Sequence, residues 1–186
     1  MSSAEPIFYI PGLLAERYFD IEKNFIHKKN RAGANIYLFE PKWFMPETHT
    51  AKLERAYNEA QDLVKKSGSL SIYAYSAGAC IAVSLLERIT QVSSATLVAG
   101  KVKGALIRNK RDDGYNTRAP YVLRTVAVSE KILSQPVDFA SKITCYHPIY
   151  DAVVPKQDTL IEGATDKTIP MLGHGAAIVL AIAINF

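Results

Sequence analysis

The chain has 186 residues, of which 48% are hydrophobic and 22% are charged, and its formal net charge is +4. This length and balance predict a single globular domain over residues 1–186 and exclude a fibrous or largely disordered protein. No basic start or long apolar block precedes the first strand-like segment, so no signal peptide is expected. We therefore expect a cytoplasmic protein.

The sequence also indicates whether to expect a membrane segment, a disulfide bond or a metal site. The apolar run at 176–184 is far shorter than the ~20 residues that span a bilayer, so it predicts a buried last helix, or one shared with a second copy in a homo-oligomer, and no transmembrane segment. Cys80 and Cys145 lie in apolar segments and are expected to pack as small hydrophobic residues. The four histidines are scattered singly, so neither a metal site nor a cofactor is expected.

Strand-like and helix-like segments alternate along the chain, which predicts a parallel sheet with right-handed crossovers. In the first helix we expect one buried face, with Glu22, Lys23 and Lys28 outside. That buried face comprises Leu14, Tyr18, Ile21 and Phe25. Expected strands are 7–10, 35–39, 70–74, 95–99, 143–147 and 167–170, and later helices are 48–67, one opening after Gly78, 154–161 and one after Gly175.

Two stretches do not fit this alternation. The loop after the second strand carries the only tryptophan, Trp43, which is interpreted as a packed loop anchor in preference to a substrate contact. Residues 104–141 show no strand rhythm, and they hold several aromatic and many charged side chains.

The segment from Leu70 to Leu86 reads as a strand, a sharp turn and a buried helix, with Ser76 at the turn. A serine there projects above the sheet, next to the backbone N–H groups that open the helix. The residues two before and two after it, Ala74 and Gly78, are both small. This pattern resembles the G-x-S-x-G nucleophile elbow of the α/β-hydrolase family, with alanine in place of the first glycine. A serine that merely caps its own helix is the alternative reading.

The resemblance implies a fold. It predicts a three-layer α/β/α sandwich around a mostly parallel six-stranded sheet in the order 2-1-3-4-5-6, without the two antiparallel strands with which the full family fold begins. It also implies that residues 104–141 are the small lid insertion of this family.

Two further segments match the family in the order that it requires. Asp151 follows the fifth strand in Asp-Ala-Val-Val-Pro, which is similar to the family's Asp-x-x-Val-Pro segment, and His174 lies between two glycines after the last strand. A serine hydroxyl needs a base and a carboxylate that orients it, and Ser76, His174 and Asp151 supply these types. Asp158 is an alternative acid, and His147 is interpreted as structural.

By the same resemblance, an oxyanion would be held by two backbone N–H groups. One belongs to Ala77, the residue after the serine. The other follows the first strand, where Pro11 stands in place of the family's histidine and has no N–H, so the donor is Leu13, with Leu14 as the alternative. Gly12, Leu14 and Tyr75 are the expected substrate-binding residues.

Positive charge is concentrated between residues 101 and 124, where seven cations face two aspartates and the local net charge is +5. Such a run is usually a solvated face, and the other reading is attraction of an anionic substrate. No nucleic-acid-binding motif accompanies these residues, so nucleic acid is not expected as a partner. The cations are Lys101, Lys103, Arg108, Lys110, Arg111, Arg118 and Arg124.

Together these features predict a serine hydrolase that cleaves an ester or related acyl bond of a small molecule, with esterases, thioesterases and lipases as the nearest types. An acyltransferase with the same three residues is a related alternative. The alternative from another class is a binding or regulatory protein that keeps the fold without turnover.

Overall fold

The computed structural model describes residues 4–13, 15–45, 47–105 and 121–185. Six strands form one sheet in the order β2-β1-β3-β4-β5-β6, and every neighbouring pair is parallel, which confirms the predicted topology. The strands are β1 (Ile7–Ile10), β2 (Ile36–Leu38), β3 (Leu70–Tyr75), β4 (Val92–Val98), β5 (Ile143–Tyr150) and β6 (Thr165–Leu172).

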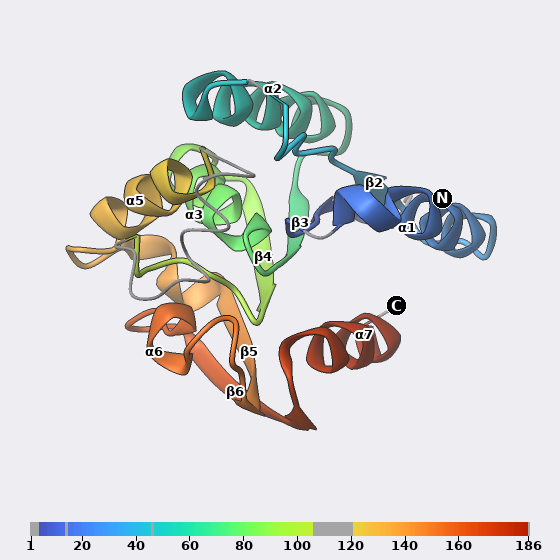
Figure 1. Cartoon of the computed structure of the whole chain (residues 1–186). Coiled ribbons are helices and arrows are strands. Elements are labelled where there is room, and N and C mark those ends of the chain that lie inside the picture. Colours follow the sequence, from blue (N-terminus) through green and yellow to red (C-terminus); the bar gives the residue numbers. More distant parts are fainter. Residues whose placement is uncertain (1–3, 14, 46, 106–120, 186) are drawn as a thin grey trace.

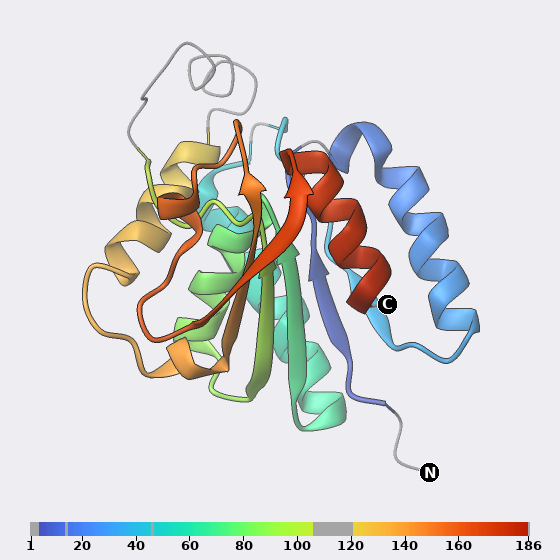
Figure 2. The same cartoon turned by 90° about the horizontal axis from the view of Figure 1, so that it is seen from below.

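Helices cover both faces of the sheet, so the chain is a three-layer α/β/α sandwich (Figures 1 and 2). On one face lie α1 (Ala15–Arg31) and α7 (His174–Asn185). On the other lie α2 (His49–Ser67), α3 (Gly78–Arg88) and α5 (Val122–Ile132). The 3-10 turn η1 (Asp138–Lys142) precedes β5, and the short α6 (Lys156–Thr159) follows it.

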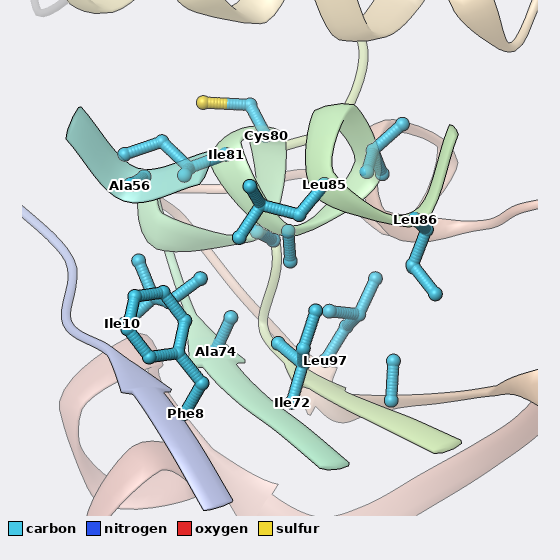
Figure 3. Packing of buried hydrophobic residues seen from close by; sticks show 14 of the residues in the cluster. Phe8, Ile10, Ala56, Ile72, Ala74, Cys80, Ile81, Leu85, Leu86 and Leu97 are labelled. Atoms are coloured by element: carbon cyan, nitrogen blue, oxygen red, sulfur yellow. The ribbon is translucent and has the colours of Figure 1, made fainter. Parts of the chain in front are cut away.

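The larger hydrophobic core lies between the sheet and α3, as Figure 3 shows. Because side chains alternate across a strand, Phe8 and Ile10 of β1 point to this face, whereas Tyr9 points to the other. Nine consecutive residues of α3, from Gly78 to Leu86, are buried. A helix that is apolar on all sides has to lie inside the protein, so the Ser76 turn before it is held between two buried elements.

Helix α2 shows how local signals set the element boundaries. Thr48 is its N-cap, and its hydroxyl accepts a hydrogen bond of 3.2 Å from the Ala51 amide. Gly68 ends the helix with a φ of +85°, a conformation that glycine adopts without strain. The predicted start and end of this helix are both confirmed.

One expectation about a helix needs correction, and the structure adds one helix to those expected. In α1, Ile21 is 66% exposed, whereas Glu22 lies half-buried against the sheet, so the buried face is rotated by about one residue from the predicted one. Within 104–141, residues 122–132 form α5, which packs against α3 as part of the helical layer. The lid insertion over residues 104–141 stays a prediction, and residues 106–120 of it lie outside the described residues.

Both cysteines are buried and unbridged, as expected, and burial raises the pKa of each thiol to about 12. Within the described ranges, no three His, Cys, Asp or Glu side chains form a group that could hold a metal ion. None of the helices in the described part of the chain is long and apolar enough to cross a membrane. The cytoplasmic location and the homo-oligomer stay predictions.

Candidate active site

Ser76 occupies the turn between β3 and α3, and its φ of +51° lies in the left-handed region that side-chain-bearing residues rarely adopt. Backbone hydrogen bonds fix this strained conformation. The Ser76 amide donates to the Val98 carbonyl at 3.0 Å, and the Ser76 carbonyl accepts from the Lys101 amide at 2.9 Å. Strain of this kind persists only where the surroundings over-determine it, and it is concentrated at functional sites.

The residues around the turn are small because backbone segments meet there. A Cβ at Gly78 would lie 2.3 Å from the Ile10 carbonyl oxygen, and one at Gly12 would lie 2.6 Å from the Ser76 Cβ. Ala74, which stands where the family pattern has glycine, is fully buried, and its methyl group belongs to the core on the α3 side (Figure 3). The sheet therefore accommodates the departure from the pattern.

The structure brings Ser76, His174 and Asp151 into one hydrogen-bonded chain. Ser76 Oγ lies 2.8 Å from His174 Nε2, and His174 Nδ1 lies 2.7 Å from Asp151 Oδ2. A carboxylate only accepts, so Nδ1 carries the proton that it shares with Asp151, which leaves Nε2 to accept from the serine hydroxyl. The three residues come from the ends of β3, β5 and β6, at one edge of the parallel sheet.

Asp151 is fixed on both of its oxygens. While Oδ2 contacts His174, Oδ1 accepts hydrogen bonds from the Val153 and Val154 amides at 2.8 and 2.9 Å. Burial alone would raise the pKa of Asp151, but the hydrogen bond and charge of His174, together with the two amides, lower this pKa below its usual value. The group is therefore a carboxylate at neutral pH and can hold the imidazole in one orientation.

The other two candidates from the sequence have different partners. Asp158 lies in α6, almost fully buried, and forms an ion pair of 3.2 Å with Lys101. His147 is buried on β5, and its Nε2 lies 3.0 Å from Asp166 Oδ1 on the neighbouring strand. Asp151, and neither of these residues, contacts His174.

The expected oxyanion donors lie beside Ser76. Among the described residues, neither the Leu13 amide nor the Ala77 amide donates a hydrogen bond to the protein. Leu13 follows directly after Gly12, whose backbone packs against Ser76, and Ala77 follows Ser76 in the chain. Leu14, the alternative donor and an expected substrate contact, lies outside the described residues.

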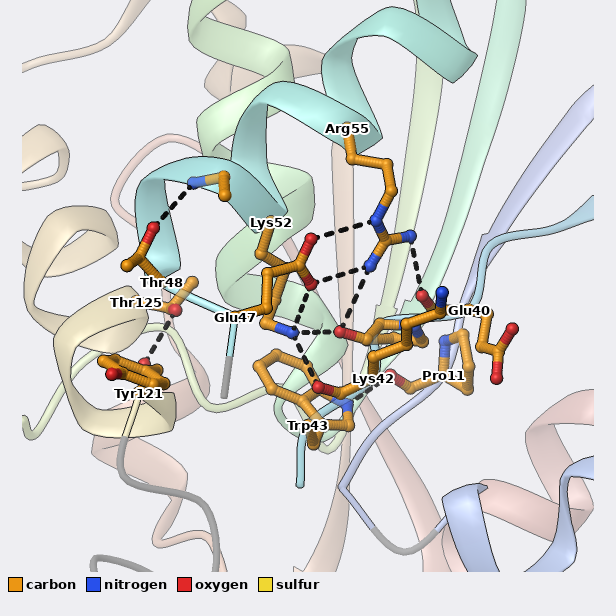
Figure 4. A network of polar contacts seen from close by, with 12 residues as sticks. Pro11, Glu40, Lys42, Trp43, Glu47, Thr48, Lys52, Arg55, Tyr121 and Thr125 are labelled. Carbon is orange, nitrogen blue, oxygen red and sulfur yellow. Dashed lines mark hydrogen bonds and ion pairs between the residues drawn. The ribbon is translucent and has the colours of Figure 1, made fainter. Parts of the chain in front are cut away.

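A polar network supports the loop that carries Leu13 (Figure 4). Trp43 is 1% exposed, as a packed anchor should be, and its Nε1 donates to the Pro11 carbonyl at 3.4 Å. Lys52, on α2, lies 5.2 Å from the Trp43 ring and donates to the carbonyls of Pro41 and Lys42. Glu47 closes the network through an ion pair of 3.2 Å with Lys52. The loop after β2 is thereby fixed against the loop after β1.

The basic run is only partly described. Lys101, Lys103 and Arg124 lie within the described residues, and the charge of Lys101 is paired with Asp158. Arg108, Lys110, Arg111 and Arg118 lie outside them. An anionic substrate therefore stays a prediction.

Sequence reasoning missed two residues beside the site. Lys52 was not singled out because a lysine on an amphipathic helix is ordinarily solvated, and nothing local shows that carbonyl groups will surround it. Glu22 was placed outside for the same reason, whereas its carboxylate accepts a hydrogen bond from the buried Tyr75 hydroxyl. The break in the apolar spacing of α1 at Ile21 is visible only once the packing is known.

Comparison with known proteins supports the fold. No family model and no curated protein matches the sequence, but many solved structures match its fold. A mature lipase from Bacillus licheniformis has a TM-score of 0.68 at 13% identity, over 99% of this chain and 91% of that one. A metagenome-derived lipolytic enzyme has a TM-score of 0.64 at 12% identity, over 100% and 94% of the two chains.

A third similar structure is that of an N-formylmaleamic acid deformylase from Pseudomonas putida, with a TM-score of 0.58 at 15% identity over 96% of this chain and 91% of that one. At such low identity these likenesses report the architecture alone. The chain has the α/β-hydrolase fold, and the chemistry has to be argued from its own residues.

Proposed function

We propose that this protein is a serine hydrolase that cleaves an ester or related acyl bond through an acyl-enzyme on Ser76. The observation that carries the proposal is the Ser76–His174–Asp151 chain, with contacts of 2.8 and 2.7 Å at a strained turn. Both distances are those of formed hydrogen bonds, so a proton can pass from the serine to the histidine without any rearrangement of the side chains.

In the first half-reaction, Ser76 Oγ attacks the carbonyl carbon of the substrate while His174 Nε2 takes the hydroxyl proton. The Leu13 and Ala77 amides donate to the oxyanion that forms. When this intermediate collapses, His174 gives the proton to the leaving group, and an ester on Ser76 remains. Water then loses a proton to Nε2 and attacks this ester, which releases the acid and returns the proton to Ser76.

Exposed apolar side chains at or after the ends of the strands favour an apolar acyl group. Ile149 and Tyr150 end β5, Leu172 ends β6, and Phe44 and Met45 lie in the loop after β2, with exposures between 40% and 71%. Tyr150 and Leu172 are partners on the neighbouring strands β5 and β6, and with Ile149 we call them the apolar rim, whereas Phe44 and Met45 follow β2 at the other edge of the sheet. Neighbouring exposed apolar side chains of this kind indicate a surface that apolar groups cover. Because burial of one CH2 contributes about 0.8 kcal/mol, kcat/KM should rise up to about fourfold for each methylene that this rim covers.

Labelling with a fluorophosphonate probe tests the proposal, because only an activated serine reacts with it. We expect labelling of the wild type, none of Ser76→Ala, and full labelling of Ser94→Ala, a control in which an exposed strand serine is removed. A folded wild-type protein that stays unlabelled would instead favour a binding or regulatory role.

Hydrolysis of p-nitrophenyl esters of rising chain length then tests the apolar rim, and a flat dependence of kcat/KM on length would argue against it. Repeating the assay with an added alcohol separates hydrolysis from acyl transfer. A new ester that forms faster than the free acid would assign the protein to the acyltransferases.

A further inference from the structure

Glu22 places a carboxyl group in the apolar layer between α1 and the sheet. Its Oε1 accepts a hydrogen bond from the Tyr75 hydroxyl, and its Oε2 is buried without a hydrogen-bond partner among the described residues. Burial raises the pKa of Glu22, and the hydrogen bond from Tyr75 opposes this shift. Burying a polar group costs folding free energy unless it is hydrogen-bonded, and among the described residues only one of the two Glu22 carboxyl oxygens has such a partner.

The Tyr75 side chain is held rigidly. It is 5% exposed, and its ring packs edge-on against Tyr9, with 6.0 Å between the centroids and 65° between the planes. Tyr9 in turn stacks on Tyr73 at 5.4 Å. The ring and its hydroxyl are thus directed into the layer beneath α1, and contact of Tyr75 with substrate stays a prediction.

The Tyr75 ring also touches the loop that carries Leu13. A Cβ at Gly12 would lie 3.1 Å from Tyr75 Cε2, so the Gly12 backbone rests on the ring. Burial and the nearby Glu22 raise the pKa of the Tyr75 hydroxyl far above its ordinary value, while a backbone hydrogen bond at Gly12 acts in the opposite direction. The hydroxyl therefore stays protonated and lies between Glu22 and Gly12.

These contacts connect three elements around one short loop. Residues 11–14 run from β1 to α1, Tyr75 ends β3 directly before Ser76, and Glu22 belongs to α1. We propose that Tyr75 and Glu22 are positioning residues, whose hydrogen bond ties α1 to β3 and so fixes the Leu13 amide relative to Ser76 Oγ. The inference rests on the proposed function, because it takes the Leu13 amide as an oxyanion donor.

The test compares Tyr75→Phe and Glu22→Leu, which remove the donor and the acceptor, with Glu22→Gln, which keeps an acceptor oxygen. Asp20→Asn, an exposed position on the same helix, is the matched control. Kinetics with p-nitrophenyl butyrate and amide hydrogen exchange over residues 8–13 are measured for each variant. Circular dichroism establishes that each variant is folded.

Loss of a whole oxyanion donor costs about 10²–10³ in kcat, so a misaligned donor should cost about tenfold. We expect this loss in Tyr75→Phe and in Glu22→Leu, with KM changed less than twofold and faster exchange at Gly12 and Leu13. Their double variant should be no worse than either single one. Glu22→Gln should recover most of the kcat that Glu22→Leu loses, and Asp20→Asn should match the wild type.

Unchanged kcat in folded Tyr75→Phe, or losses that multiply in the double variant, would overturn the proposal. A wild type that neither hydrolyses esters nor reacts with a fluorophosphonate would refute the proposed function instead. In that case amide hydrogen exchange alone tests whether the Tyr75–Glu22 hydrogen bond holds the loop. Unaltered exchange at Gly12 and Leu13 in Tyr75→Phe would show that the hydrogen bond does not hold the loop.

Discussion

Replacing Gly78 by alanine tests the packing of the Ser76 turn directly. The new Cβ would lie 2.3 Å from the Ile10 carbonyl oxygen and 2.9 Å from the Pro11 oxygen, whereas ordinary contacts begin at 3.4 Å. Both neighbours are backbone atoms, so no side chain can rotate away, and β1 has to move by about 1 Å relative to α3. A shift of this size at a reacting centre lowers the rate on the order of 100-fold.

Overpacking of this kind also costs about 2 kcal/mol of folding free energy, which corresponds to a fall in Tm of about 4–8 °C for a chain of this size. Gly175→Ala is the matched control, because Gly175 adjoins His174 in α7 and a Cβ there meets nothing within 4 Å. This control should raise stability by about 0.5–1 kcal/mol. Ester kinetics and thermal unfolding are measured for both variants, and a Gly78→Ala protein with normal kcat and Tm would refute the placement of β1 against α3.

Three further predictions concern the polar chain itself. Ser76→Ala and His174→Ala should each lower kcat on the order of 10⁴-fold or more, and the double variant should be scarcely worse, because residues that act as a unit do not lose activity additively. If the losses in kcat multiply in the double variant, the two residues do not act as one unit. Asp151→Asn should lose about 10⁴ in kcat. Asp158→Asn should keep kcat but lower Tm, because this substitution leaves the Lys101 ammonium group without its ion-pair partner. The reverse pattern would assign the catalytic acid to Asp158. Because the pKa of Asp151 is lowered in the folded state, its contribution to stability is complete above its unfolded pKa of about 3.9 and is lost as the pH falls through the folded pKa. Urea unfolding between pH 5 and pH 2 should therefore show a steeper loss for the wild type than for Asp151→Asn, and parallel curves would contradict this assignment.

The sheet topology was predictable because strands and helices alternate clearly along the chain and the central strands β1 and β3 are largely buried apolar runs, although the edge strand β6 is mostly exposed. Helix α5 was missed for a definite physical reason. Two of the residues on its buried face are polar, and their hydroxyl groups bond to backbone carbonyls, Ser129 to Val102 at 2.6 Å and Thr125 to Tyr121 at 2.9 Å. A pattern of hydrophobic spacing does not register hydroxyl groups that are satisfied in this way.

The residues of the candidate site also differ in whether a local sequence pattern indicates them. Ser76, Asp151 and His174 each follow a strand, in the order of the family pattern, so they could be predicted from the sequence. The structure brings the three side chains together. Lys52 and Glu22 carry no such local signal, because their burial depends on groups far away in the sequence. The spacing of residue types along the sequence therefore predicts site residues at strand ends, but it does not predict side chains that support the site through long-range contacts.

The hydrogen bond between Ser76 and His174 joins positions 98 residues apart, and His174 lies on the last helix, α7. During synthesis, β1 to β4 and the helices between them emerge well before this histidine does. The serine therefore has no base until β6 has added to the sheet edge and α7 has docked beneath it. Under the proposed function, Ser76 is therefore inert in the growing chain and reactive only in the folded one.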